Sequence, residues 1–587
     1  MASLGLQFLR VGIAGFALTA ISSAQMSVTL TPSLPSPAPV ATMITWNASV
    51  PDSPAGTIWY RFRVREGGGD YTVIRDYGPL ASLDWTAADH EGLYEVEVSA
   101  KNRQTGELAA TSSVYQMLSR VGSAGPVISP TSHPLVFLYS ALCPGGSRMK
   151  VQFQAWEGAI QETPFKECQA GRSINFYLAG LRSNTAYTAR HIIDARGQLT
   201  TGPDILFGMG QQATGLFTET VLQPPATQIS SPILLGSSLN GSVAHDLEGN
   251  VVWYTNNGIY TVTRAEDGGY FWGVIESQQL DVSQQVIRKF DLVGMTVLET
   301  NAARVNEQLA AMGRRPITGF HHEARTLPDG RIAALAGVEQ ILTDVQGPGP
   351  VDVLGDMIVV LDSNLNVVWT WDAFDHLDVT RTAVLGETCG PVSACAPFYL
   401  AKAANDWTHG NALQQTPDGE LLYSSRHQDW LIKVSYRNGT GDGHVIWRLG
   451  KDGDFQINST DPWPWFSHQH DGNFELSDPS ALLVFDDGNT RVASIGGHSR
   501  GQVFKLDEQN RIASFILNAD LGVFSLAVGS AQLLPDHNYH FDAGFVPEGK
   551  GVAYSIEVDG AGHIVYEAKA NAILYRTFRM TNLYTPN

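Results

Sequence analysis

The sequence predicts an all-β protein, with a six-bladed β-propeller preceded by two β-sandwich domains. Apolar and polar residues alternate over many short runs, which is the pattern of half-buried strands. The 58 glycines and 29 prolines are scattered without a period, which indicates many turns rather than a disordered chain. At 587 residues the chain is too long for one ordinary domain, and its 43% hydrophobic residues supply a sizeable core.

The first 24 residues have the features of a signal peptide. Arg10 supplies a positive charge, the run from Val11 to Ile21 is apolar, and small residues follow up to Ala24. The alternative is a membrane anchor, but this apolar run is too short to span a bilayer, and no other stretch is long and apolar enough for a transmembrane helix. We therefore expect residues 1–24 to be a signal peptide, no membrane span, and a periplasmic or secreted protein.

Residues 25–118 are predicted to form the first sandwich. Its clearest strands alternate apolar and polar residues over 44–47, 58–64 and 94–98. The segment Glu91-Gly92-Leu93-Tyr94 resembles the tyrosine corner of immunoglobulin-like domains. A linker with glycine and serine at 119–126 ends this domain.

Residues 127–212 are predicted to form a second sandwich. The run from Leu181 to Tyr187 resembles the end of a fibronectin type III domain. Neither sandwich contains a motif that carries chemistry, and we interpret both as structural or docking units.

Residues 213–587 carry a recurring phrase, which predicts the propeller. A turn rich in Asp, Gly and Asn leads into two aliphatic residues and an aromatic one at 251–253, 367–369, 445–447 and 564–566. Weaker copies near 296–298 and 511–513 bring the number to six. The irregular spacing of about 45 to 80 residues is typical of propeller blades with loop insertions.

Four cysteines fit an oxidising compartment. Cys389 and Cys395 have five residues between them and can close a small disulfide, which leaves Cys143 and Cys168 as the second pair. The alternative is a zinc site, but the chain has no C-x-x-C pair. We therefore expect disulfides.

The formal net charge of −20 restricts the partners. It opposes non-specific binding to nucleic acid, which needs clustered Lys and Arg to displace counterions. It also repels anionic substrates at long range, so a site for a sulfate or phosphate ester needs local positive charge. We expect no nucleic-acid partner, and the sequence leaves open whether the chain forms a homo-oligomer.

Histidines cluster in short polar phrases beside the repeats, at 320–325, 406–411, 424–428 and 467–471. The innermost strand of each propeller blade begins near the central channel, so phrases far apart in sequence can meet in one polar funnel. The alternative is that they are turn or packing histidines, which is how we interpret His444 and His563.

Three kinds of site use these residue types: a hydrolytic metal centre, a nucleophilic histidine, and a binding site for an anion. Glu323 and Asp471 each follow a histidine directly, and adjacent residues on a strand point to opposite faces. Such an acid is therefore not expected to share a metal with its neighbour, and Arg426 is a poor neighbour for a cation. We expect an anion site without metal or cofactor.

At these phrases the chain resembles the bacterial arylsulfate sulfotransferases, exported enzymes that do not use the nucleotide sulfate donor. The resemblance covers roughly residues 130–587, through the order of the phrases and the cysteine pair before the second one. It implies that His470 becomes transiently sulfated, that His409 and Asn411 match the family's His-x-Asn pair, and that Arg426 matches its arginine.

The family pattern also favours His322 as the channel-facing residue of the first phrase, with His321 as its rival, and we expect Ser530 to supply a further channel hydroxyl. In these roles Arg426 and the Asn411 amide donate to the sulfuryl oxygens, while His322 and a second histidine, His409, serve the phenol as acid and base. Because the nucleophile must be unprotonated, the rate is expected to fall as the pH drops through about 6.5.

The sequence therefore predicts ping-pong transfer from an aryl sulfate donor to a phenol acceptor. One alternative is a sulfatase or phosphatase on the same propeller, with water as the acceptor. The other is a propeller without catalytic activity that binds sulfated or aromatic ligands.

Overall fold

The computed structural model describes residues 26–586, except 52–56, 123–124, 157, 209, 226–230, 239, 256–261, 278 and 391–394. Strands make up 52% of the structure and helices 6%, so the prediction of an all-β protein is confirmed. The expected signal peptide, 1–24, lies outside the described residues. No helix in the described part of the chain is long and apolar enough to cross a membrane.

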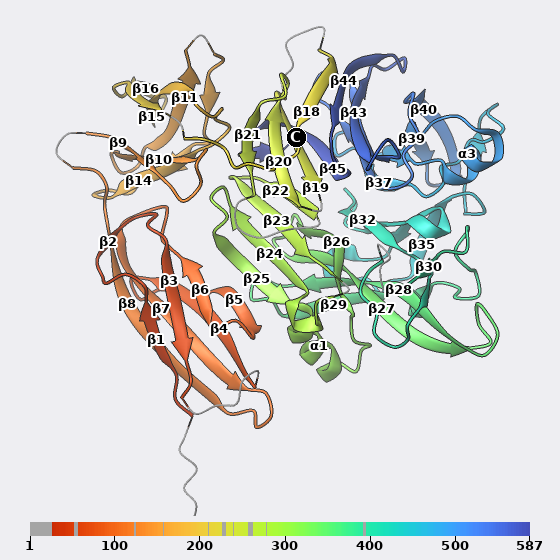
Figure 1. Ribbon diagram of the computed structural model, residues 1–587, viewed down its shortest axis with the longest axis horizontal. Helices are drawn as coiled ribbons and strands as arrows, with labels where there is room; N and C mark the ends of the chain where they lie inside the picture. Colours follow the sequence, from red (N-terminus) through yellow and green to blue (C-terminus); the bar gives the residue numbers. More distant parts are fainter. Residues whose placement is uncertain are drawn as a thin grey trace, which may run out of the picture.

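The N-terminal strands form two sheets around one core, at the lower left of Figure 1. One sheet contains β1 (Thr29–Pro32), β3 (Ile44–Ser49) and β6 (Ser82–Trp85). The other contains β2 (Ala38–Pro39), β8 (Leu108–Leu118), β7 (Gly92–Asn102), β4 (Ile58–Glu66) and β5 (Thr72–Gly78). Alternate residues of both sheets fill the core, among them Trp46, Phe62 and Tyr115. The Tyr94 hydroxyl donates to the His90 carbonyl at 2.9 Å, the contact that defines a tyrosine corner.

The next strands form a second pair of sheets, above the first pair in Figure 1. The smaller sheet contains β9 (Val127–Pro130), β10 (Phe137–Leu142) and β14 (Ser173–Leu178). The larger contains β11 (Arg148–Ala155), β12 (Gln161–Glu162), β13 (Lys166–Glu167), β15 (Ala186–Ala195), β16 (Gln198–Thr201) and β17 (Ile205–Gly208). The predicted disulfide between Cys143 and Cys168 is present.

Residues 219–586 form six sheets among the described residues, each built on four antiparallel strands. In chain order the complete sets are β22 (Val262–Glu266), β23 (Tyr270–Ile275), β24 (Val286–Asp291), β25 (Thr296–Asn301); β26 (Gly319–Thr326), β27 (Ile332–Thr343), β28 (Pro350–Leu361), β29 (Val367–Asp372); β32 (Gly410–Gln415), β33 (Leu421–Ser425), β34 (Trp430–Val434), β35 (Val445–Gly450); β37 (His470–Phe474), β38 (Ala481–Asp486), β39 (Arg500–Asp507), β40 (Ile512–Asp520); and β41 (Gly529–Leu533), β42 (Tyr539–Val546), β43 (Val552–Val558), β44 (Ile564–Ala570).

The sixth sheet joins the two ends of this region. The late strand β45 (Leu574–Asn582) pairs with β19 (Ile233–Ser238), which continues into β20 (Gly241–Asp246) and β21 (Val251–Tyr254). The early strand β18 (Glu219–Gln223) pairs in turn with β44. Both ends are therefore held by backbone hydrogen bonds that only the folded chain can make.

The remaining described elements of this region are short additions to the sheets. They are helices α1 (Ala302–Ala311), α2 (Ala373–His376) and α3 (Asn489–Ile495), the 3-10 helices η1 (Val282–Gln284), η2 (Arg426–Gln428) and η3 (Arg437–Gly439), and strands β30 (Thr388–Cys389), β31 (Ala404–Asp406), β36 (Gln456–Asn458) and β46 (Thr585–Pro586).

The first strands of the six described sheets, β22, β26, β32, β37, β41 and β45, lie beside one another in chain order. The last of them returns to the first, because the Arg264 guanidinium on β22 lies 5.4 Å from the ring of Phe578 on β45. Residues at equivalent positions on these strands therefore face a common centre.

The N-terminal sheets dock on the sheet formed by β22 to β25. Strand β5 pairs in parallel with β25 at Arg75 and Glu299, and these two side chains form a buried ion pair. The Asn301 amide adds a bond to the Tyr77 carbonyl at 2.9 Å. Residues 26–118 therefore extend a sheet of the larger region, a role that the sequence analysis did not supply.

Candidate functional site

The histidine phrases occur where the first strands bulge. Among the described residues the pairing register shifts on β26 between His321 and Ala324, on β32 around Asn411, on β37 after His470, and on β45 around Tyr575. A bulge inserts an unpaired residue and re-aims its side chain. These bulges lie at corresponding ends of their strands, so they direct the side chains to one place.

Three histidines and one tyrosine gather there. The ring of His322 lies 5.1 Å from the ring of His409 and 5.3 Å from that of Tyr575, centroid to centroid. The Tyr575 ring lies 6.3 Å from that of His470. The first, second and fourth phrases therefore meet at this point, together with Tyr575.

His470 is held by a carboxylate. Its ring is 2% exposed, and Nδ1 lies 2.6 Å from Oδ2 of Asp487, just after the strand that pairs with β37. Burial lowers the pKa of His470 well below its usual range, and the nearby Arg426 acts in the same direction. When Asp487 accepts the Nδ1 hydrogen, Nε2 keeps a free lone pair. The arrangement suits a neutral nucleophile.

The first phrase contains two histidines with different surroundings. His321 Nε2 lies 2.9 Å from Oδ1 of Asp356, and its Nδ1 lies 2.8 Å from Nδ1 of His322. Although burial opposes it, the hydrogen bond with Asp356 raises the pKa of His321. Burial and the charge of His321 lower the pKa of His322 well below its usual range. A protonated His321 therefore donates to His322 and leaves the hydrogen of His322 on Nε2.

Asp406 joins the second and third phrases, because its carboxylate contacts His409 and its backbone carbonyl bonds His427. Nδ1 of His409 lies 2.7 Å from Oδ2 of Asp406. His427 donates from Nδ1 to the Asp406 carbonyl at 2.7 Å, so its Nε2 accepts from Arg426 Nη1 at 2.6 Å. The rings of His409 and His427 lie 4.5 Å apart. The bond to His427 holds Arg426 beside the imidazole cluster and uses only Nη1, so the other N–H groups of the guanidinium do not bond His427.

Asn411 is fully buried on β32. We expected its amide to donate to the sulfuryl oxygens, but it bonds the protein backbone. Its Nδ2 donates to the Gln469 carbonyl at 2.7 Å, directly before His470. The backbone carbonyl of Asn411 accepts from the Tyr575 hydroxyl at 3.1 Å and from the Arg576 guanidinium. The structure therefore assigns Asn411 a part in holding the backbone at His470, with one amide hydrogen left over.

Ser530 is buried on β41, but its hydroxyl bonds to the neighbouring strand. It donates to the Thr577 carbonyl at 2.6 Å and accepts from the Thr577 N–H at 3.2 Å. These contacts join β41 to β45. The hydroxyl that we expected in the channel is thus bonded to the neighbouring strand, and its place as a channel group stays a prediction.

Most of the carboxylates that bond the histidines were not predicted from the sequence, and neither was the place of Tyr575 in the cluster. A signal for Asp487 was present in the sequence: two acids, Asp486 and Asp487, stand at the end of the strand β38, which pairs with the strand of His470. Asp356 and Glu387 carried no such signal, since they lie far from their histidines in sequence.

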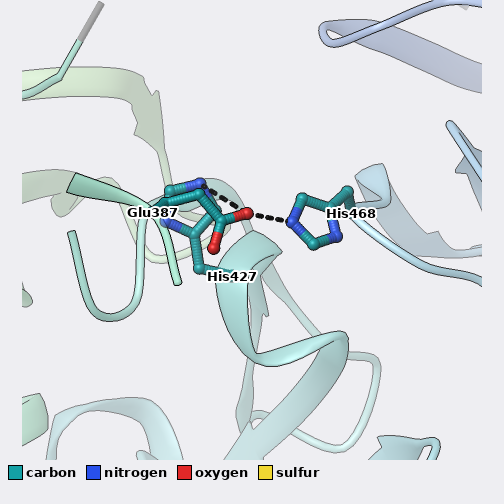
Figure 2. A group of neighbouring side chains, drawn as sticks. All are labelled: Glu387, His427 and His468. Atoms are coloured by element: carbon teal, nitrogen blue, oxygen red, sulfur yellow. Dashed lines mark hydrogen bonds and ion pairs between the residues drawn. The ribbon is translucent and has the colours of Figure 1, made fainter. Parts of the chain in front are cut away.

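Figure 2 shows Glu387 between His427 and His468. The Glu387 carboxylate contacts Nε2 of His468, and Nδ1 of His468 lies 3.0 Å from Asp429. Although burial opposes it, Asp429 and Glu387 raise the pKa of His468. The three groups of Figure 2 lie close enough together for a metal ion, but Nε2 of His427 already accepts from an arginine. Charge and hydrogen bonding fit an ion-pair network better than a ligand set.

Glu323 and Asp471, the acids next to the histidines, face away from the cluster. Glu323 bonds Arg264 and Arg576, each at 2.8 Å, and although burial opposes it, these arginines lower its pKa to about 2. Asp471 lies 3.7 Å from Arg576 Nε. Together they form a buried ion layer beneath the imidazoles.

The expected disulfide between Cys389 and Cys395 is present beside this region. It starts two residues after Glu387, so the cross-link restrains the segment that supplies the carboxylate of Figure 2.

Comparison with known proteins gives one informative match. A family model described as Arylsulfotransferase (ASST) matches residues 219–577. No curated protein matches the chain. Among solved structures, the selenomethionine-substituted chicken interferon gamma receptor alpha chain aligns at 9% identity over 31% of this chain and 97% of its own, with a TM-score of 0.13. That score does not indicate a shared fold.

Proposed function

The chain belongs to the arylsulfotransferase family, and we propose that it transfers the sulfuryl group of an aryl sulfate to a phenol through a sulfated His470. The observation that carries this proposal is the pairing of His470 with Asp487 at 2.6 Å inside the imidazole cluster. Such a pair fixes the tautomer that has a lone pair on Nε2.

We propose that residues 213–587 are the catalytic domain and form a six-bladed propeller. The six sheets of the described residues and the pairing of both ends of the region support this architecture. The two sheet pairs within 25–118 and 127–212 are proposed as immunoglobulin-like and fibronectin-like sandwiches. The two disulfides support export to the periplasm or the medium.

In the first step, Nε2 of His470 attacks sulfur and the bond from sulfur to the phenol oxygen breaks. The Nε2 hydrogen of His322 passes to the departing phenolate, whose conjugate acid has an ordinary pKa near that of tyrosine, about 10. The hydrogen that protonated His321 donates moves at the same time onto Nδ1 of His322, so both imidazoles end neutral. Arg426 donates to the sulfuryl oxygens, where negative charge develops. The products are a phenol and the sulfated histidine.

In the second step, a new phenol takes the place of the first. His322, now with its hydrogen on Nδ1, accepts the phenol proton on Nε2 as the oxygen attacks sulfur, and its Nδ1 hydrogen returns to His321. The bond between sulfur and Nε2 of His470 breaks, its electron pair returns to that nitrogen, and a new aryl sulfate leaves. His409 lies beside His322 and is proposed as the second acid–base group.

The test is transfer from 4-nitrophenyl sulfate to phenol, measured as release of nitrophenol and formation of phenyl sulfate. His470→Ala is expected to lower the rate by at least about 10³-fold, because the nucleophile is lost. Sulfur-35 from a labelled donor should appear on His470 when no acceptor is present. Nitrophenol release by His470→Ala at the wild-type rate would contradict the proposal, and release that is independent of phenol would indicate a hydrolase.

A further inference from the structure

A cavity lies at the opposite ends of the same strands. It has a volume of about 400 Å³, and every first strand contributes to its lining. The lining residues include Arg264, Arg325, Gln414, Asn473, Leu533 and Phe578. Four of them follow a site residue by three positions along a strand, which at about 3.3 Å per residue places the cavity roughly 10 Å away from the imidazoles.

The ion layer separates this cavity from the site of His470. Glu323 and Arg576 are almost completely buried and bond to each other at 2.8 Å. Asp471 lines the cavity, whereas its neighbour His470 belongs to the imidazole cluster. The cavity and the imidazole cluster therefore lie on opposite sides of the ion layer, although the strand β37 contributes residues to both.

Charged side chains of both signs line the cavity, namely Arg264, Arg325, Arg579, Asp471 and Glu475. Burial raises the pKa of Asp471. Arg264 is paired with Glu323, and Arg579 is paired with Glu557. The third guanidinium of the lining has no such partner among the described residues.

Arg325 is that guanidinium. Its Nη1 donates to the Leu413 carbonyl at 2.6 Å, and in the described chain no carboxylate lies within 4.0 Å of its nitrogens. Burial and the repulsion of Arg264 lower its pKa to about 10. A partly buried guanidinium without a directly paired carboxylate favours an external anion, and guanidinium binds sulfate and sulfonate groups with paired hydrogen bonds.

The lining also contains apolar side chains beside polar ones such as Gln414, Asn473 and Gln532, and it reaches the surface. Phe474 and Leu534 are buried, and Phe578 lies under the Arg264 guanidinium. Leu476, at the rim, is 70% exposed, so the cavity opens to solvent. Such a volume with a few polar groups is typical of pockets for small organic ligands.

We propose that this cavity is a second binding site, for a small aromatic anion of the aryl sulfate or sulfonate class. Arg325 binds the anionic group, and Phe578 and Phe474 enclose the ring. The ligand is bound and not transferred, because the histidine of the lining, His537, is exposed and, among the described residues, has no carboxylate paired with it as Asp487 is with His470.

The proposal is tested by calorimetric titration with benzenesulfonate, whose carbon–sulfur bond does not permit transfer. Wild-type protein is expected to bind two molecules per chain. Arg325→Met should weaken one of the two sites by about tenfold or more. Arg426→Met should weaken the other, and the exposed control Arg437→Met should weaken neither.

A crystal of the wild-type protein with 4-bromobenzenesulfonate gives a result that does not depend on the folding of any variant. Anomalous bromine signal beside Phe578 is expected. Signal beside His470 alone, or two unchanged sites in a folded Arg325→Met protein, would overturn the proposal. Both measurements detect binding without turnover, so their outcome is independent of whether His470 is the nucleophile.

Discussion

Replacement of Asp487 by asparagine tests the tautomer of His470 directly. The hydrogen bond from Nδ1 to the buried carboxylate is charge-assisted, and losing such a bond costs about 1.5–3 kcal/mol, or roughly 10- to 150-fold in rate. Asparagine can also donate its amide hydrogen to Nδ1, which moves the imidazole hydrogen to Nε2 and removes the lone pair. In histidine–aspartate pairs the wrong tautomer costs up to about 10⁴-fold. We expect Asp487→Asn to slow transfer by about 10²- to 10⁴-fold.

The same change should not weaken the fold. Burial raises the pKa of Asp487 well above its usual range, so the neutral amide avoids a buried carboxylate. Single-turnover release of nitrophenol measures the transfer step, and chemical denaturation measures the free energy of unfolding.

Asp442→Asn is the matched control, because Asp442 also bonds a histidine Nδ1 at 2.6 Å but in an exposed turn. It is expected to leave both quantities unchanged. If Asp487→Asn keeps its transfer rate within about threefold of wild type, the carboxylate does not set the tautomer and the mechanism is refuted.

Three further predictions concern pH, the network of Figure 2 and the docked sandwich. Because burial raises the pKa of Asp487, kcat/KM should fall as the pH drops through that raised pKa, and Asp487→Asn should lack this acid limb in its pH profile. Glu387→Gln removes one anion from His468 and should lower the free energy of unfolding by about 1–3 kcal/mol in a denaturant titration; an unchanged value would contradict the network. Arg75→Met leaves Glu299 with one arginine fewer and should cost about 3 kcal/mol, seen as an earlier first transition on heating; no shift would mean that this pair does not hold the sandwich in place.

The site could be located from the sequence but not completed. The phrases around His322, His409 and His470 are local, and the repeats beside them, interpreted as propeller blades, predict that the phrases converge. Strand alternation also accounts for Glu323 and Asp471, which bond arginines on the other face of the strands. From the sequence we predicted an acid limb near pH 6.5 from the nucleophile; burial lowers the pKa of His470 and raises that of Asp487, so we now predict that the limb follows the carboxylate.

Composition and local pattern determined the class of this protein: the strands, the turns, the cysteine pairs and the family motifs are all short-range features. Tertiary structure alone decided the partners of the functional side chains. Asp356 and Glu387 meet their histidines, and β5 meets β25, only through pairing between distant segments. Bulges then set the direction of each side chain, as the inward ring of His322 and the strand-bound hydroxyl of Ser530 show. One inserted residue changes the face that a strand presents, and no local pattern records where that insertion falls.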